Sequence, residues 1–439
     1  MKAEINWLWG ELGSAYSSVP KKRRVEEVDL SRAINRVLAA DVVAAQPVPR
    51  IARAATDGCA VSASAFAEAA ANHPIELQSI PLFHSGPLTG TQVMFIPANH
   101  AMPEGTDALI PIDLYEVCGG EKACKSIRVN ATTGIRYCIV PPVVGTGVAQ
   151  VGSEVEAGAV LAKSGERLSL AVMAAAALAG VERVKVNCKP SVGIILMPRR
   201  SLDPDQDEHD RELVAGFRAI AVGALNAFGV PDPAILVMDP PVDCDANCQA
   251  ARDFIASYDL VLIVGQANGD ETAHYVPLNA WIASTNPTPF RLGQHPRCQV
   301  RIMRNNMHLL REARRLSNFV DQTRTTNTAV IQLMGNPAAA LTMMHLLVKP
   351  TLQWLEGFDP DLTPASARLI ADEPIAPEPW VRLLWGRVSF SADAQLCFSP
   401  HRVPNDESLG PVDTNAFAIV LSTDPAIHPG DAIRIVQIS

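Results

Sequence analysis

The sequence predicts a multidomain protein in which an α/β domain is flanked by β-rich domains. At 439 residues the chain is too long for one ordinary core, which favours two to four domains. Between residues 190 and 350, short apolar runs alternate with helix-length segments, the pattern of βαβ units and of a parallel sheet covered on both faces. Elsewhere, short apolar runs separated by Gly and Pro indicate β-rich domains.

The elements before residue 190 are predicted from hydrophobic periodicity and from glycine. Apolar residues recur along one stripe from Asp29 to Ala39, which predicts an amphipathic helix, and a strand is expected over Asp41–Ala44. Residues 51–140 have the short runs of a small β-rich domain. An alanine-rich helix is predicted over Leu168–Leu178, ended by Gly180 at the position after the helix that glycine favours.

Four strands and three helices are predicted for the α/β domain: strands Val192–Met197, Ala234–Met238, Asp259–Val264 and Thr328–Met334, and helices Arg211–Phe228, Ala246–Ser257 and Pro337–Val348. Ligands of such sheets bind beyond the carboxyl ends of the strands, so the loops after Met197, Val264 and Met334 should converge. A linker is expected over Asp359–Pro379, followed by a compact β domain over Trp380–Ser439.

Composition excludes several classes of protein. Hydrophobic residues make up 48% and charged residues 19% of the chain, as in folded proteins. A net charge of −9 argues against a nucleic-acid-binding surface. No secretory signal is visible, and the apolar stretch from Leu168 to Val181 is too short to span a bilayer. Nine cysteines, an odd number without zinc-finger spacing, favour ordinary thiols in a reducing compartment, and therefore a cytoplasmic protein.

Several short segments occur in an order that is typical of one enzyme family. They are Arg36–Val42 followed by Thr56–Val61, then Pro103–Leu109, Gly152–Leu168 and Gly335–Leu341. Together they resemble the MoeA-type molybdopterin molybdenumtransferases, which are related to the E domain of gephyrin. The resemblance runs in register from about residue 25 to the C-terminus. It identifies the chain as a divergent member of a MoeA-like family.

The resemblance implies a domain plan and an activity. It implies a linker domain from residues 1–50 and 141–188, a small β-rich domain at 51–140, a three-layer, MogA-like α/β molybdopterin-binding domain at 189–358, and a C-terminal β-barrel at 375–439. Members of the family form elongated homodimers. They insert molybdate into adenylylated molybdopterin and release AMP, assisted by a divalent cation such as Mg²⁺. Their active cleft lies between the α/β domain of one subunit and the β domain of the other.

The resemblance also marks candidate site residues. Asp57 and Asp270 match aspartates that are catalytic or metal-associated in the family. Asp57 precedes Gly58 at a turn that glycine tolerates best, and a residue that bonds its own backbone is the alternative. Around Asp270, the segment Gly265 to Gly269 is one residue shorter than the family loop, which leaves ligand contact and a structural turn equally open. Cys59, where the family usually has tyrosine, is expected to be a buried small residue.

The turn Gly335-Asn336-Pro337 is a candidate anion site. It places backbone N–H groups and a helix N-terminus at a strand end, where a phosphate or a pterin edge could bind. A plain strand-to-helix turn with proline at the first helical position is the alternative. The match to the family favours ligand contact.

Two departures from the family pattern affect the predicted chemistry. Arg199, Arg200 and Ser201 stand where the family has a pair of carboxylates. Guanidinium groups cannot bind a divalent cation, but they can hold phosphate or molybdate by paired hydrogen bonds. His100, in the sequence Ala98-Asn99-His100, occupies a segment where the family usually shows Thr-Gly-Ala. A surface histidine explains His100 simply, and a substrate contact is the alternative because the cleft is expected there.

Two functions follow from these residues. The first is a molybdotransferase in which Asp57, Asp270 and the Gly335–Pro337 turn do the family's work, with Arg199, Arg200, Ser201, Gly265, Gly269 and His100 contacting substrate. The second is a catalytically inactive paralogue that binds a pterin and serves in the assembly or delivery of a molybdenum or tungsten enzyme. The family resemblance favours the first. No metal-ligating residue is assigned, and no nucleic-acid or membrane partner is expected.

Overall fold

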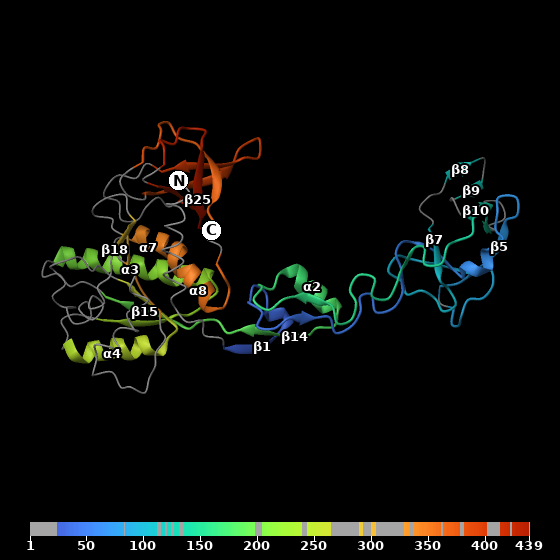
Figure 1. Ribbon diagram of the computed structural model, residues 1–439, viewed down its shortest axis with the longest axis horizontal. Coiled ribbons are helices and arrows are strands. Elements are labelled where there is room, and N and C mark those ends of the chain that lie inside the picture. Colours follow the sequence, from blue (N-terminus) through green and yellow to red (C-terminus); the bar gives the residue numbers. More distant parts are fainter. Residues whose placement is uncertain are drawn as a thin grey trace. The chain divides into compact units, whose positions relative to one another are not determined.

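The structure is a computed structural model that divides the chain into two compact units (Figure 1). One unit is Val25–Val186, and the other is Asn187–Ser439 together with the residues up to Arg24. The structure describes residues 24–82, 84–111, 116–118, 121–123, 127–130, 136–197, 204–238, 244–264, 289–292, 300–303, 329–333, 337–360, 363–377, 382–401, 413–421 and 424–438.

Two short ladders and one helix form the first part of the Val25–Val186 unit. The ladders pair strand β1 (Val25–Asp29) with β14 (Arg183–Asn187), and β2 (Val42–Val43) with β13 (Val160–Ala162). Helix α2 (Leu170–Leu178) begins after Ser169, whose side chain accepts a hydrogen bond from the Val172 backbone N–H. It ends at Leu178, and Gly180 follows the cap residue with a φ of +76°, so the predicted alanine-rich helix and its glycine stop are confirmed.

The helix predicted from Asp29 to Ala39 is wrong. Only a 3₁₀ turn, η1 (Leu30–Arg32), forms, and Asn35 has a φ of +60°. The backbone N–H groups of this segment bond to distant residues instead: that of Leu30 to the Glu182 carbonyl and that of Leu38 to the Glu166 carbonyl. The apolar side chains do enter a core, which also includes residues of α2, but they reach it from irregular backbone.

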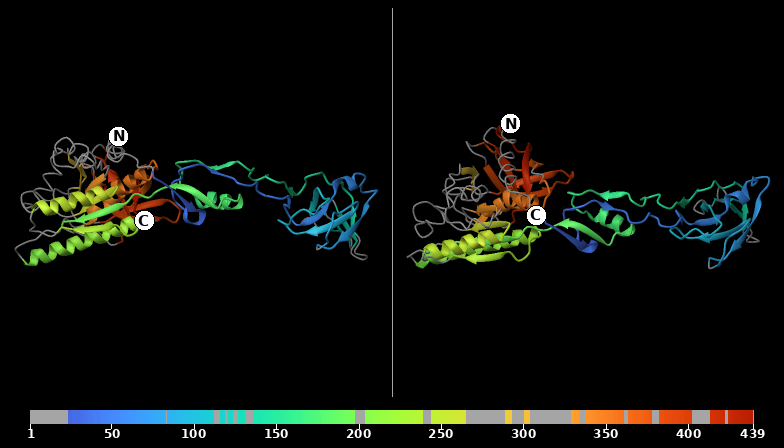
Figure 2. Two further views of the ribbon diagram at one scale, coloured as in Figure 1. Left: turned by 90° about the horizontal axis from the view of Figure 1, so that it is seen from below. Right: turned by 60° about the horizontal axis from the view of Figure 1, so that its bottom comes forward.

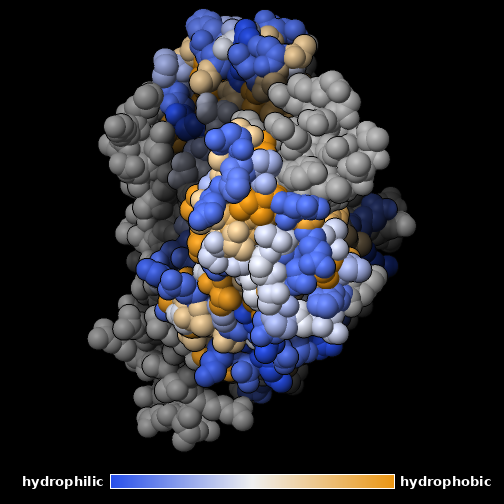
Figure 3. Space-filling view, turned by 90° about the vertical axis from the view of Figure 1, so that its right-hand side faces the viewer, coloured by the Kyte–Doolittle hydropathy of each residue, from blue (hydrophilic) through white to orange (hydrophobic). Residues whose placement is uncertain are grey.

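The rest of this unit is β-rich, as predicted. An eight-stranded sheet has the order β7-β4-β6-β5-β11-β10-β9-β8, and β3 pairs with β12 beside it. The bounds are β3 Arg53–Ala54, β4 Gly58–Val61, β5 Ile75–Ile80, β6 Gln92–Ile96, β7 Ala108–Pro111, β8 Glu116–Cys118, β9 Glu121–Ala123, β10 Ile127–Asn130, β11 Arg136–Cys138 and β12 Val148–Ala149, with the 3₁₀ turn η2 at Ala63–Phe66. On the face seen in Figure 3, apolar side chains lie scattered among polar ones.

The second unit contains a parallel four-stranded sheet of order β16-β15-β17-β20. Its strands are β15 (Val192–Leu196), β16 (Ala234–Val237), β17 (Leu260–Val264) and β20 (Ala329–Leu333). Side chains of alternate residues enter two separate cores. One contains residues of helix α3 (Pro204–Ala227) and the other residues of α4 (Cys244–Ser257), which lie on opposite faces of the sheet (Figure 1). The predicted three-layer α/β fold is therefore present.

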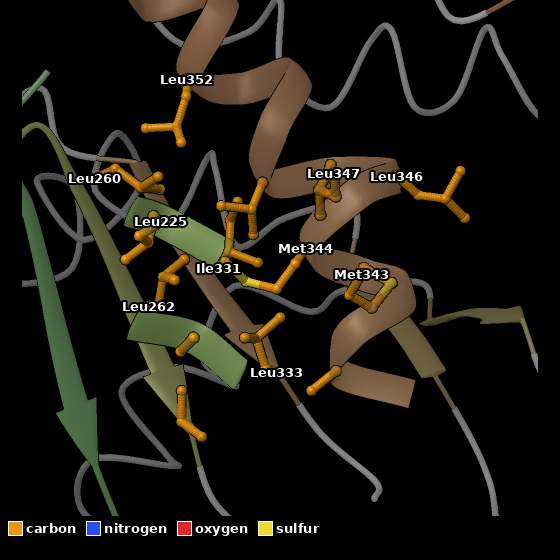
Figure 4. Close-up of a cluster of buried hydrophobic side chains, with 14 of the residues drawn as sticks. Leu225, Leu260, Leu262, Ile331, Leu333, Met343, Met344, Leu346, Leu347 and Leu352 are labelled. Atoms are coloured by element: carbon orange, nitrogen blue, oxygen red, sulfur yellow. The ribbon is translucent and has the colours of Figure 1, made fainter. Parts of the chain in front are cut away.

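The core on the α3 face continues into the helices after β20 (Figure 4). The helix predicted over Pro337–Val348 is instead α7 (Pro337–Met343), a π-helical turn η5 (Met344–Val348) and α8 (Lys349–Leu355). Helix α3 also begins earlier than predicted. Strands β18 (Pro289–Leu292) and β19 (Val300–Met303) form a separate pair.

A closed five-stranded barrel completes the second unit, with strands in the order β21-β23-β22-β24-β25. Their bounds are β21 Ala365–Leu369, β22 Arg382–Phe390, β23 Leu396–Pro400, β24 Ala416–Val420 and β25 Ala432–Gln437. The first strand lies inside the segment predicted as a linker, so that prediction is wrong: Leu369 is fully buried in the barrel core. The barrel and the α7–α8 helices lie side by side (Figure 2), sharing Phe417 and a hydrogen bond from the Trp385 indole to the Thr342 hydroxyl.

Candidate functional site

Asp57 lies in the turn between β3 and β4, and its side chain holds a second loop. Oδ1 of Asp57 accepts a hydrogen bond of 2.7 Å from the backbone N–H of Ala98, 41 residues further along the chain. Asp57 is exposed. This contact is neither the bond to its own backbone that the turn alternative predicted nor a ligand contact. The carboxylate ties two loops together at the surface.

Gly58 is required by close packing and not by the turn. It is the first residue of β4, which lies between β6 and β7, and its φ is not positive. A Cβ atom built on Gly58 would lie 2.6 Å from the Ile110 carbonyl oxygen and 2.8 Å from Cγ of Leu109. The expectation of a special backbone conformation at Gly58 is therefore wrong, and the physical reason for glycine is the approach of the β7 backbone.

Three more hydrogen bonds hold the loop that carries His100. The Ala54 N–H donates to the His100 carbonyl (2.9 Å), and the Asn99 N–H donates to the Ala54 carbonyl (2.8 Å). Nη1 of Arg53 donates to the Asn99 carbonyl (2.9 Å), where Asn99 has a φ of +65°. We call residues 53–57 and 97–101 the Asp57 platform. It brings Asp57 and His100, two predicted site residues, onto one connected surface.

Arg53 is a platform residue that the sequence did not single out. Its role depends on the approach of the 97–101 loop, and no local pattern near Arg53 reveals which loop will lie beside it. The only signal in the sequence is that Arg53 stands three residues before Thr56-Asp57-Gly58. On the His100 side, ring atom Nδ1 lies 2.9 Å from the Ala101 carbonyl oxygen, and the residue is half-buried.

The Pro103–Leu109 segment supports the fold of this unit. Oδ1 of Asp107 accepts from the Ala63 N–H at 2.7 Å, at the start of η2, and the Thr106 hydroxyl donates to the Pro103 carbonyl. Gly105 has a φ of +84°, and a Cβ atom there would collide with the Leu88 backbone. Asp107 therefore anchors a turn, and this structural role explains the segment without a ligand.

In the α/β domain, the carboxyl ends of all four parallel strands are aligned. Leu196 of β15 is paired with Val237 of β16 and with Val264 of β17, which in turn is paired with Leu333 of β20. The segments that follow Met197, Val264 and Leu333 therefore leave the sheet at one edge, which is where ligands of open α/β sheets bind.

Most predicted site residues of that edge lie outside the described residues. These are Arg199, Arg200, Ser201, Gly265, Gly269, Asp270, Gly335 and Asn336. Pro337 is described and is the first residue of α7. The structure thus gives the strand ends from which these loops depart and the helix that Pro337 begins.

Within the described part of the chain, no three His, Cys, Asp or Glu side chains are grouped so as to hold a metal ion. Asp57 is the one described residue among the two predicted catalytic aspartates, and it offers a divalent cation a single carboxylate. The described residues therefore do not make a magnesium site by themselves. Cys59 is buried in the sheet core, as expected. No described helix has the length and hydropathy needed to cross a membrane.

Comparisons with known proteins agree with this architecture. Residues 11–180 match the MoeA N-terminal region (domain I and II). The chain is 24% identical over 436 residues to the molybdopterin molybdenumtransferase of Bacillus subtilis, covering 95% of this chain and 91% of that protein. It is 23% identical over 337 residues to the enzyme of the same name from Staphylococcus epidermidis, covering 75% of this chain and 71% of that one.

A solved structure shows the same fold over nearly the whole chain. The molybdopterin biosynthesis moeA protein of Pyrococcus horikoshii superimposes with a TM-score of 0.66 at 18% identity, covering 98% of this chain and 99% of that one. Domain I and II sequence, full-length relatives and the complete fold all point to one group of proteins. The chain is therefore similar to MoeA-type proteins, in the sequence of its N-terminal part and in fold over nearly its whole length.

Proposed function

We propose that this protein acts in molybdenum-cofactor biosynthesis, as a transferase that inserts molybdate into adenylylated molybdopterin and releases AMP. The observation that carries the proposal is the aligned carboxyl end of the parallel sheet, where the three strands that precede the predicted ligand loops end side by side. A relative named molybdopterin molybdenumtransferase, whose match spans 95% of this chain, supports the same reaction.

In this proposal the site residues divide by charge. Asp57 and Asp270 supply carboxylates for the reaction, while Arg199, Arg200 and Ser201 hold the anionic parts of the substrates. In the turn Gly335-Asn336-Pro337, Pro337 begins α7, whose N-terminal N–H groups favour a phosphate or a pterin edge. Paired guanidinium groups suit phosphate and molybdate because both present several oxygens at hydrogen-bonding distance.

The arginine pair sets the expected metal dependence. Replacing two negative charges by two positive ones at a cation site disfavours a divalent cation by several kcal/mol, roughly, at an effective dielectric constant near 20. We therefore propose weaker dependence on Mg²⁺ than a carboxylate pair would give. If activity has been lost together with the family's pair of carboxylates, restoring one carboxylate by Arg200→Asp should raise turnover in the presence of magnesium.

We further propose that the protein is a cytoplasmic homodimer. Helix α2 contains no charged residue, and Leu170 and Leu178 expose 69% and 64% of their surface on it. An uncovered apolar helix face of this kind is typical of a protein interface. Sedimentation velocity should show a dimer, and Leu178→Glu should shift it towards monomer, while Leu170→Gln with Leu178→Gln tests the same face without charge. A monomeric wild-type protein would contradict the proposal.

The function is tested by mixing the purified protein with adenylylated molybdopterin and molybdate and measuring AMP, with and without magnesium. Molybdate-dependent AMP release is expected. Tight binding of the pterin without AMP release would favour the assembly or delivery protein for a molybdenum or tungsten enzyme, which is the reading that the arginine pair supports. Absence of binding would show that only the scaffold has been retained.

A further inference from the structure

The imidazole of His100 contacts the backbone of its own loop. Its Nδ1 lies 2.9 Å from the carbonyl oxygen of Ala101. A carbonyl oxygen can only accept a hydrogen bond, so Nδ1 must carry the hydrogen. In the neutral ring the other nitrogen, Nε2, then carries a lone pair and no hydrogen. The neutral imidazole of His100 is therefore a hydrogen-bond acceptor at Nε2.

The backbone that carries this ring is fixed from the opposite loop. Nη1 of Arg53 donates to the Asn99 carbonyl, one residue before His100, and Ala54 bonds to both Asn99 and His100 through its own backbone. The Asp57 carboxylate holds Ala98 on the other side of the turn. Of these contacts, only those of Arg53 and Asp57 depend on side chains, so these two residues determine how firmly the turn is held.

We propose that Nε2 of His100 accepts a hydrogen bond from an N–H or O–H donor of the bound substrate, and that Arg53 positions it for this contact. The inference rests on the proposed function and names the part of the substrate that His100 binds. An unprotonated Nε2 has no hydrogen to give to molybdate or phosphate oxygens. The matching groups are the N–H donors of a pterin and the hydroxyl groups of a ribose.

Substitution can distinguish a ring that accepts a hydrogen bond from substrate from a ring that is merely structural. Glutamine can place its side-chain oxygen near the position of Nε2, whereas alanine cannot. His100→Ala should weaken binding of adenylylated molybdopterin about three- to tenfold, the value of one net hydrogen bond, and His100→Gln should stay within about twofold of wild type. Arg53→Met should weaken binding of adenylylated molybdopterin by less than His100→Ala does. Arg53→Lys should bind it as the wild type does, because a lysine ammonium can still donate to the Asn99 carbonyl.

Nitrogen NMR on the histidine-labelled full chain gives a readout that needs no ligand. The wild type should show the Nδ1–H tautomer for His100, assigned by its loss in His100→Gln, and Arg53→Met should show a mixture of tautomers. An Nε2–H tautomer in the wild type would overturn the inference. Equal affinities of wild type and His100→Ala for the pterin would also overturn it.

Two simpler probes identify the donor. If the pterin supplies it, His100→Ala should weaken binding of 6-hydroxymethylpterin and leave AMP binding unchanged, and the reverse is expected if the ribose supplies it. No effect on either probe would overturn the inference. Failure of the proposed function is distinguishable from these results: the wild type would then bind the adenylylated pterin with the expected dependence on His100 but release no AMP.

Discussion

The carboxylate of Asp57 accepts a hydrogen bond from the backbone N–H of Ala98 at 2.7 Å, and so joins the turn before β4 to the loop that carries His100. An ionised carboxylate has about four lone-pair sites, so this bond leaves acceptor capacity for chemistry. The same side chain can therefore serve the fold and the reaction.

Substitution at Asp57 should separate these two roles. Asp57→Asn keeps an oxygen that can accept from Ala98 but removes the charge, so we expect a near wild-type melting temperature and a loss of AMP release of at least tenfold. Asp57→Ala removes both, and should also lower the free energy of unfolding by about 1–2 kcal/mol because the Ala98 N–H loses its partner. Thermal unfolding and AMP release are measured on the same preparations. Full activity in Asp57→Asn would show that the charge is not used.

Two glycine-to-alanine substitutions should have opposite effects on stability. In Gly58→Ala the new Cβ atom would lie 2.6 Å from the Ile110 carbonyl oxygen, so β4 and β7 must separate, at a cost of about 3 kcal/mol. In Gly223→Ala, on the exposed side of α3, nothing lies within 4 Å of the new atom, and the helix should gain about 0.5–1 kcal/mol. Urea unfolding monitored by circular dichroism compares the two. A neutral Gly58→Ala would contradict the packing argument.

The sequence predicted the parts of the fold that follow from local pattern. The apolar runs Val192–Met197 and Asp259–Val264 are strands of the parallel sheet to within a residue or so, because a strand buried on both faces has a continuous apolar signature. Helix α4 and the glycine stop of α2 were likewise predicted from periodicity and from Gly180.

The predictions that were wrong depended on distant partners. The stripe Leu30, Val37, Leu38 has helical spacing, yet its backbone bonds to residues 166–185, and that pairing outweighs local periodicity. The segment that contains β21 is rich in Pro, Asp and Ala and so predicts a linker, because this composition does not reveal that Ala367 and Leu369 close a barrel. For the same reason Arg53 was missed: its partner, the Asn99 carbonyl, is 46 residues away.

Asp259 should be a major determinant of stability in the second unit. This carboxylate is almost completely buried, and its Oδ2 accepts from the Ser191 N–H (2.8 Å), the Ser191 hydroxyl (2.9 Å) and Nη2 of Arg24 (2.6 Å). Asp259→Ala leaves the two donors of half-buried Ser191 without this acceptor, and we expect a loss of about 3–4 kcal/mol. Arg24→Met should cost about 1 kcal/mol or less, because the arginine side chain is largely exposed.

A double-mutant cycle of these two substitutions measures the ion pair itself. Chemical denaturation of the wild type, both single variants and the double variant gives the coupling energy. A coupling below about 1 kcal/mol with a large effect of Asp259→Ala alone would show that Ser191, and not Arg24, is the main partner. If Asp259→Ala were neutral, the assigned bonds of Ser191 would be wrong.

His345 should make stability depend on pH in a defined window. It lies in the π-helical turn η5, its ring packs edge-on to Phe228, and its Nδ1 is buried without a hydrogen-bond partner among the described atoms. Burial, followed by the positive charge of Lys349, lowers the pKa of His345 from 6.5 to about 4. The folded protein therefore keeps this ring neutral in a range where the unfolded chain protonates it.

The sign of the effect follows from proton binding. Between pH 6.5 and 4 the unfolded state binds a proton that the folded state does not, so stability should fall as the pH falls through this range, by at most about 3 kcal/mol from this group. Urea unfolding at pH 7.5 and 4.5 measures the loss. His345→Gln should reduce the loss, whereas His428→Gln, at an exposed histidine, should leave it unchanged. Equal losses in both variants would mean that the buried ring of His345 does not control acid stability.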